Sequence, residues 1–175
     1  MSAVPGKAPA VKFPPEVEDP RALLLEQLGK LLTIEETLAR LVLPHLVQEL
    51  NDHELKKVVE EHLGETRTHA SNVKRAFLAL GEVPAGKPAL GLDGLRSEHK
   101  ATAPKVDPSL RPSVHVAAAM GTEHYEINAY EAAIRVAGAL GAEDVEGLLR
   151  ANLDQEVAAL DKLGKQADRL AKQSG

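Results

Sequence analysis

The sequence contains no cysteine and very few aromatic residues. Without cysteine, the chain cannot form disulfides, iron–sulfur clusters, cysteine-ligated zinc sites or thiol nucleophiles. Aromatic residues make up 2% of the chain and hydrophobic residues 43%, so the core must consist mainly of Leu, Val and Ala. A length of 175 residues suits one domain with one sizeable core.

Excess positive charge and long apolar runs are also missing. The 21 Lys and Arg residues against 26 Asp and Glu residues give a net charge of -5, which repels phosphate backbones. We therefore expect no nucleic-acid partner. No apolar run approaches the ~20 residues of a spanning helix, and the N-terminus shows no apolar secretory region. These absences predict a cytoplasmic protein that does not bind membranes.

Proline is almost confined to two stretches of the chain. Five prolines lie within residues 1–20 and five within residues 81–112, and Pro44 is the exception. Because proline lacks an amide donor and clashes with the preceding helical turn, we predict a flexible tail over residues 1–19 and a long connection over residues 81–112. Pro44 should bend the helix that contains it.

Four long helical patterns fill the remaining sequence, and strand patterns of period two are missing. The helices are expected over residues 20–50, 52–80, 113–140 and 143–172. Short links make the first two, and the last two, antiparallel neighbours. The middle connection exceeds the ~13 extended residues that run back along a ~42 Å helix. The sequence thus predicts an all-α, ferritin-like four-helix bundle over residues 20–175, two antiparallel helix pairs joined by one long crossover, with a helical turn over residues 92–99.

Glutamates interrupt the apolar row of each predicted helix near its midpoint. In a bundle of equal helices these midpoints lie at one height, so the carboxylates would meet in the core, where each unpaired charge costs several kcal/mol. Divalent metal neutralises such a cluster best, because carboxylates on facing bundle helices make the usual di-iron or di-manganese site. The candidate ligands are Glu36, Glu65, His69, Glu123, Glu126 and Glu156, with His62 as a weaker candidate.

Other interpretations of the same residues stay open. The glutamates could be solvated residues at the edge of each apolar row, or they could be protonated. They could also pair with arginine, for which Arg40, Arg67 and Arg135 are available if they turn inward. In that case the chain would be a non-enzymatic helical stress or scaffold protein. We expect Tyr130 to be an ordinary core residue and His115 to lie at the surface or a helix end.

The string Glu123-His124-Tyr125-Glu126-Ile127, together with His62-Leu63-Gly64-Glu65-Thr66 and Leu43-Pro44, resembles the YciF-like family over about residues 25 to 168. This is a ferritin-like family of bacterial stress-associated proteins whose biochemical activity is unsettled. The resemblance implies a ferritin-like bundle, often dimeric, with a dinuclear metal centre. The residues that it places at the centre are Glu36, Glu65, Glu123, Glu126 and Glu156.

One feature departs from the usual di-iron pattern, which has Glu-x-x-His on two helices. The predicted fourth helix has no histidine near Glu156. A carboxylate-rich site favours hard cations, so we expect two iron or manganese ions per chain. The expected chemistry is metal oxidation or peroxide removal. If the protein is an enzyme, it would be a di-metal oxidoreductase of the ferroxidase or peroxidase kind, assembled as a homo-oligomer, most simply a dimer.

Overall fold

The structure is a computed structural model that describes residues 17–173. All regular elements of this range are helical, which confirms the all-α prediction. Most of the predicted tail, residues 1–16, lies outside the described residues. The elements are α1 (Pro20–Thr37), a π-helical turn (Leu38–Val42), α2 (Leu43–Glu49), α3 (His53–Ala79), α4 (Leu90–Thr102), a 3₁₀ turn (Ala103–Lys105), α5 (Arg111–Ala139) and α6 (Glu143–Gln173).

Helix ends follow local chemistry that the sequence displays, and the predicted ends of the four long segments agree within two residues. Asp19 caps α1 by accepting a hydrogen bond from the Ala22 amide at 2.7 Å, and Asp52 caps α3 by accepting from the Leu55 amide at 2.9 Å. Gly81 ends the α3 region with a φ of 74°, a left-handed conformation that favours glycine.

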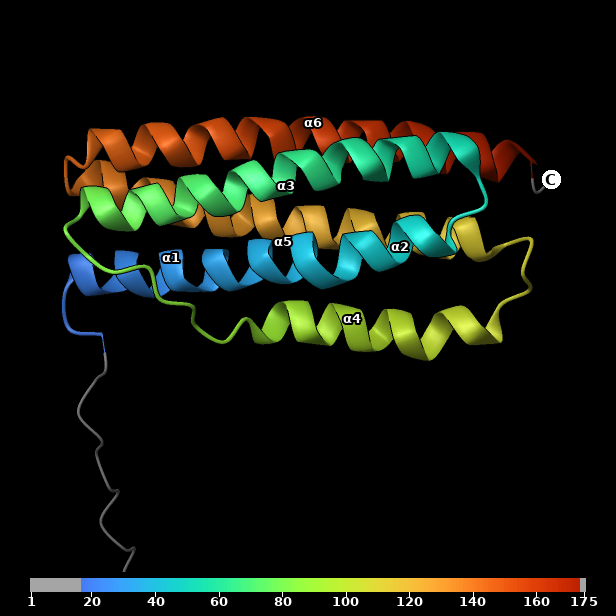
Figure 1. Cartoon of the computed structure of the whole chain (residues 1–175), viewed down its shortest axis with the longest axis horizontal. Helices are drawn as coiled ribbons and strands as arrows, with labels where there is room; N and C mark the ends of the chain where they lie inside the picture. Colours follow the sequence, from blue (N-terminus) through green and yellow to red (C-terminus); the bar gives the residue numbers. More distant parts are fainter. Residues whose placement is uncertain (1–16, 174–175) are drawn as a thin grey trace, which may run out of the picture.

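The four long helical segments lie side by side (Figure 1). The segment α1–α2 packs on α3 and α5, and α6 packs on the same two helices. Figure 1 shows α1 antiparallel to α3 and α5 antiparallel to α6. The chain then runs back along the length of the molecule, so that α5 begins at the end where α3 begins. The connection between α3 and α5 therefore runs along the length of the molecule.

The connection holds a longer helix than the turn predicted over residues 92–99. Helix α4 has 13 residues and packs mainly on α5. Leu92 is its buried residue, while Asp93 lies in the first turn and Lys100 in the last, where these charges oppose the helix dipole. Amphipathic spacing and end charges thus stabilise a full helix there.

The first long helix is irregular where the sequence has Pro44. Proline cannot donate to the carbonyl four residues earlier, and the π-helical turn Leu38–Val42 lies directly before α2. A π turn takes in an extra residue, so the apolar stripe shifts around the helix at this point. Before the π turn, the buried row is Leu24, Leu28, Leu31 and Glu35, and Leu38, the first residue of the turn, is buried as well.

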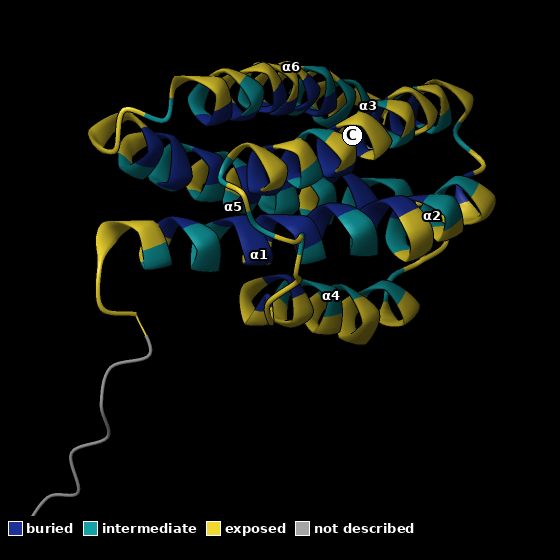
Figure 2. Cartoon of the chain, turned by 60° about the vertical axis from the view of Figure 1, so that its left-hand side comes forward, coloured by how far each residue is buried: buried dark blue, intermediate teal, exposed yellow. Residues whose placement is uncertain are grey.

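The buried residues of the described helices lie on the sides of the helices that face one another (Figure 2). They form two apolar clusters, one around Leu28, Tyr130 and Leu149, the other around Leu38, Leu55 and Leu163. In α3 and α6 the buried polar residues lie between the residues of the two clusters along the helix. Among the described residues, no helix combines the length and the apolar character that crossing a membrane requires.

Candidate metal centre

Six ionisable side chains from all four long segments are buried together, and we call them the buried cluster. They are Glu35 from α1, His62 and His69 from α3, Glu123 and Glu126 from α5, and Glu156 from α6. None of the six is more than 6% exposed. Burying four carboxyl groups and two imidazoles together destabilises a small helical protein unless protons or a cation neutralise the carboxylates.

The buried cluster divides into two overlapping sets of ligand atoms. His62, Glu123, Glu126 and Glu156 each offer one atom that lies within 4.8 Å of the others, and Glu35, His69 and Glu156 do the same. Glu156 belongs to both sets, so its two carboxylate oxygens can face two neighbouring positions. This is the arrangement that a bridging carboxylate has in a dinuclear centre.

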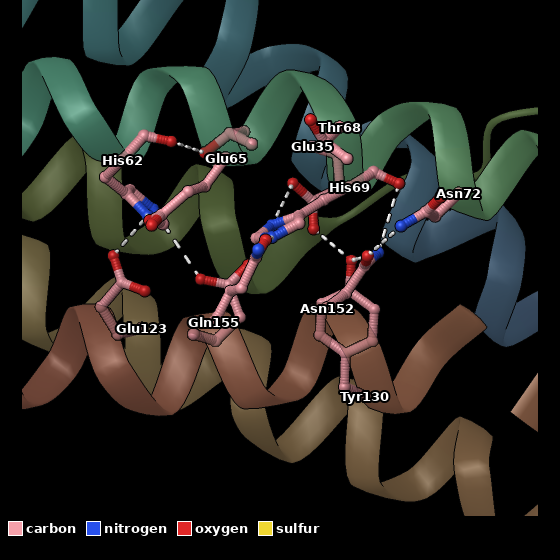
Figure 3. Close-up of polar contacts among 12 residues, drawn as sticks. Glu35, His62, Glu65, Thr68, His69, Asn72, Glu123, Tyr130, Asn152 and Gln155 are labelled. Carbon is pink, nitrogen blue, oxygen red and sulfur yellow. Dashed lines mark hydrogen bonds and ion pairs between the residues drawn. The ribbon is translucent and has the colours of Figure 1, made fainter. Parts of the chain in front are cut away.

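His69 presents a free nitrogen to the carboxylates. Its Nε2 lies 2.7 Å from Gln155 Oε1 and donates a hydrogen bond to that oxygen. In the neutral imidazole Nδ1 then carries the lone pair, 2.8 Å from Glu156 Oε1 and 3.6 Å from Glu35 Oε2 (Figure 3). Metal-binding histidines commonly have such an outer partner, which sets the tautomer and the ring orientation.

In the other ligand set, His62 likewise has an outer partner on one ring nitrogen and carboxylates near the other. Its Nδ1 lies 3.4 Å from Glu65 Oε2, while its Nε2 lies 3.2 Å from Glu123 Oε1 and 3.8 Å from Glu156 Oε2 (Figure 3). Glu65, predicted as a ligand, therefore sits behind the histidine rather than inside the cluster. Its carboxylate also lies 3.6 Å from Lys162 Nζ.

Most carboxylate oxygens of the buried cluster have no hydrogen-bond partner. The unpartnered atoms include both oxygens of Glu126, both of Glu156 and one each of Glu35 and Glu123. Burial raises the pKa of Glu126 well above its ordinary value, and the neighbouring Glu156 and Glu35 raise it further. No basic side chain contributes to this shift. Oxygens that are buried, unpartnered and convergent fit the donor set of a divalent cation.

The pKa values of the two histidines are raised, although burial alone would lower them. Burial opposes the charged imidazole of His69, but Glu156 and Glu35 outweigh it and raise its pKa to about 10. In the same way Glu123 and Glu65 raise the pKa of His62 well above the ordinary value. Without metal, the cluster thus holds extra protons. A metal ion would have to displace them, so binding is coupled to proton release.

A hydrogen-bonded chain behind the cluster holds Glu35. The Tyr130 hydroxyl donates to Glu35 Oε1, and Asn152 Nδ2 donates to the Tyr130 hydroxyl at 3.0 Å. Asn152 in turn accepts a hydrogen bond from Asn72 Nδ2 at 2.8 Å (Figure 3). Tyr130 is therefore more than the ordinary core residue predicted from the sequence. It orients a carboxylate of the cluster.

The predicted inward position of Glu36 is wrong, and Glu35 occupies that position instead. The Glu36 side chain is 31% exposed and lies 2.6 Å from Lys74 Nζ. The apolar row used for the prediction ran from Leu32 through Ala39 to Leu43, across the π turn. The apolar stripe shifts around the helix at the π turn. Apolar residues after the turn therefore do not show which face of the helix is buried before the turn. The row before the turn, which ends on Leu31 and Leu38 around Glu35, would have indicated the right one.

Arginine does not neutralise the cluster, contrary to the alternative considered above. Arg40 lies 3.4 Å from Glu36 and Arg135 lies 2.9 Å from Glu131, both on the surface, and Arg67 is exposed. His124 is also exposed, as its position on the helix predicts. Protons or metal remain as the neutralising agents.

A small cavity borders the buried cluster. It holds a volume of about 20 Å³, which is roughly the space of one water molecule. Its walls include Leu43, Val59 and Leu163, and His62, Glu123 and Lys162 also border it. A molecule about the size of water could lie against His62 and Glu123 there.

Comparisons with known proteins agree with the architecture. A family model described as a domain of unknown function (DUF892) matches residues 19–174. YcfI from Rhodopseudomonas palustris, provisionally described as a structural protein, is 30% identical and superposes with a TM-score of 0.83, covering 87% of this chain and 98% of its own. A search of the curated proteins finds no match.

Two more distant structures share the fold. The stress protein YciF from E. coli is 22% identical with a TM-score of 0.82, covering 89% of this chain and 98% of its own. A protein from Xanthomonas campestris is 19% identical with a TM-score of 0.69, covering 87% of this chain and 94% of its own.

Proposed function

The chain belongs to the DUF892 family of YciF-like proteins, and on that premise we propose that it binds two iron or manganese ions in its buried cluster. The bundle would then be of the ferritin-like four-helix kind, and the protein would carry out metal oxidation or peroxide removal under stress. The observation that carries the proposal is the pair of overlapping ligand sets that share Glu156. A stress role is included because YciF of E. coli is a stress protein.

The residues of the two sets have distinct roles. His62, Glu123 and Glu126 would hold one ion, Glu35 and His69 would hold the other, and Glu156 would hold both. Iron or manganese bound there would supply the redox chemistry toward dioxygen or peroxide. The small cavity bordered by His62 and Glu123 is where a small reactant would meet this ligand set.

Several side chains would prepare the ligands without touching the ions. Gln155 and Glu65 keep the inner nitrogens of His69 and His62 free of protons when metal is present. Tyr130 holds the Glu35 carboxylate by donating to one oxygen, so that the second oxygen stays free. Such outer partners reduce the reorganisation that metal binding requires.

The alternative function is that of a helical stress or scaffold protein without metal. One observation favours it: the histidines lie so close to the carboxylates that protonated His62 and His69 can offset part of the buried negative charge. YcfI is provisionally described as a structural protein, which agrees with this alternative. The two functions differ in whether divalent metal binds at the cluster.

Metal content and its dependence on single carboxylates test the proposal. Purified protein, stripped with chelator at acidic pH, is titrated anaerobically with Fe²⁺ or Mn²⁺, dialysed and analysed by mass spectrometry for metal per chain. We expect two ions for the wild type, one for Glu35→Gln and none for Glu156→Gln. Glu36→Gln is the matched control on the same helix, because its side chain faces Lys74, and it should retain both ions.

The results would separate the two functions. Equal metal content in Glu156→Gln and the wild type would contradict the proposed centre. A wild type that binds neither ion, with all variants folded, would favour the scaffold alternative. Peroxide or dioxygen consumption by the loaded protein then tests the chemistry as a separate step.

A further inference from the structure

A second cluster of metal-ligating side chains lies outside the buried cluster, at the junction of α4 and α5. His99 in the last turn of α4 and His115 near the start of α5 face each other, with His99 Nε2 2.9 Å from His115 Nδ1. Their rings are 5.1 Å apart between centroids and tilted by 54°. The sequence predicted His115 at the surface or at a helix end; it lies near the start of α5, and it is buried, with 8% of its surface exposed.

We propose that His99 and His115 form a surface binding site for a divalent transition-metal ion, with Cu²⁺ preferred over Ni²⁺ and Zn²⁺. Two imidazole nitrogens supply softer ligands than the carboxylates of the buried cluster, and imidazole suits copper, nickel and zinc. The site does not depend on the proposed function of the buried cluster.

The separation of the two nitrogens suits a chelated ion. Metal–nitrogen bonds of about 2.0 to 2.1 Å at a right angle place neighbouring nitrogens about 2.9 Å apart, as in tetragonal copper or nickel sites. The observed separation is also 2.9 Å. A tetrahedral zinc site needs about 3.3 Å and hence a small opening of the pair. The rings must turn so that both lone pairs converge, and His99, which is partly exposed, has room to do so.

The proton balance of binding follows from the pair itself. In the metal-free pair one ring donates an N–H to the nitrogen of the other. When metal binds, His99 Nε2 and His115 Nδ1 both become ligands: the ring that donated the hydrogen bond moves its proton to its outer nitrogen, and the other ring keeps its proton there. A neutral pair therefore binds metal without net proton release. Burial and the neighbouring His99 lower the pKa of His115, which favours the neutral, metal-binding form near neutral pH.

The charges around the pair define the rest of the site. The Glu49 carboxylate at the end of α2 favours the charged form of His115, so its negative charge can attract a cation to the pair. His45 lies 3.4 Å from Glu49 on the same helix. Arg111 acts against a cation, but its side chain is tied back by a 3.3 Å hydrogen bond to the Val106 carbonyl.

Metal at this site would fasten α4 to α5. Helix α4 has Leu92 as its one buried residue and packs mainly on α5, so its attachment is weaker than that of the long helices. The pair sits at the end of α4 that leads through residues 103–110 into α5. An ion bound by both rings would hold the end of α4 against the start of α5 and so restrict the motion of residues 103–110.

Copper titration separates this site from the buried cluster. The full chain carrying Glu156→Gln, which removes the shared ligand of the buried cluster, is titrated with Cu²⁺ alone by calorimetry and followed by electron paramagnetic resonance near pH 7.5. In this background we expect one copper ion with nitrogen hyperfine structure from two imidazoles. Adding His99→Gln should weaken that binding at least about tenfold, which corresponds to about 1.4 kcal/mol.

His124→Gln is the matched control, because His124 is an exposed histidine of α5 away from the pair. It should bind copper like its parent. Because His99 is partly exposed, His99→Gln should fold like its parent, and circular dichroism checks this. Equal copper affinity and an unchanged spectrum in His99→Gln and His124→Gln would overturn the proposed site, whatever the buried cluster binds.

Discussion

Glu126 offers the sharpest test of whether the buried cluster is built for metal, because the metal-free protein gains nothing from its charge. It is 0% exposed, and neither carboxylate oxygen has a hydrogen-bond partner. The charged neighbours that shift its pKa, Glu156, Glu35 and Glu123, are all acidic. We therefore expect Glu126→Gln to stabilise the metal-free protein and to weaken metal binding at the same time.

The magnitude follows from the proton that Glu126 must hold. Keeping a carboxyl protonated costs about 1.4 kcal/mol for each pH unit above its ordinary pKa of 4.5, so at about pH 7 this cost is at most about 3 kcal/mol. Glutamine has the same shape and needs no proton, and its buried amide is as poorly partnered as the neutral carboxyl. For a chain of this size, about 3 kcal/mol corresponds to a rise in Tm of roughly 6 to 12 °C.

The assay is thermal unfolding by circular dichroism, in chelator and with added Mn²⁺. In chelator at about pH 7 the variant should melt above the wild type, and the gain should nearly vanish at about pH 4.5, where both carry a neutral group. With Mn²⁺ the wild type should gain more than the variant. Glu36→Gln, on the surface, should change stability by less than about 1 kcal/mol at either pH. A Glu126→Gln protein that is less stable at both pH values in chelator would refute the reasoning.

Three further predictions concern the surroundings of Glu126. The metal-free wild type should lose stability as the pH rises above about 5. The reason is that the pKa values of Glu35, Glu156 and His69 are raised, so the folded chain holds more protons than the unfolded chain. A urea midpoint that is higher at about pH 8 than at about pH 5 would contradict this. Gln155→Leu should lower the Mn²⁺ affinity, measured by titration, about 10- to 100-fold, because His69 loses the hydrogen bond that sets its tautomer. Gln155→Glu can still accept this hydrogen bond and should lower the affinity less. Tyr130→Phe should cost about 1 to 3 kcal/mol in urea unfolding, because Glu35 and Asn152 each lose a buried partner, and an unchanged midpoint would mean that this chain of hydrogen bonds does not stabilise the fold.

Much of the architecture could be predicted from local signals. Asp19-Pro20 and Asp52 mark helix starts, Gly81 marks a helix end, and the length of the segment 81–112 requires a connection that runs along the molecule. Each of these signals acts through residues that are neighbours in the sequence. The length of α4 was underestimated, because its stability depends partly on contacts with α5 that no local pattern reveals.

The composition of the buried cluster was only partly predictable. Glu123, Glu126, Glu156 and His69 lie on regular helices, where spacing places a residue on the correct face. Glu35 was missed because the π turn after it shifts the stripe. His62 and Glu65 were given the wrong order of importance, because spacing put both near one face and could not tell which side chain reaches the other helices.

The sequence by itself determined that this protein is helical, where its long helices begin and end, and that each helix carries ionisable groups at its middle. These properties follow from backbone hydrogen bonding, capping and periodicity, which act over a few residues. Only the tertiary structure decided which carboxylates converge, which histidine nitrogen faces them, and that His99 meets His115 across a turn of the chain. Those outcomes depend on side-chain directions in four helices at once, where a rotation by a single residue turns a ligand toward solvent.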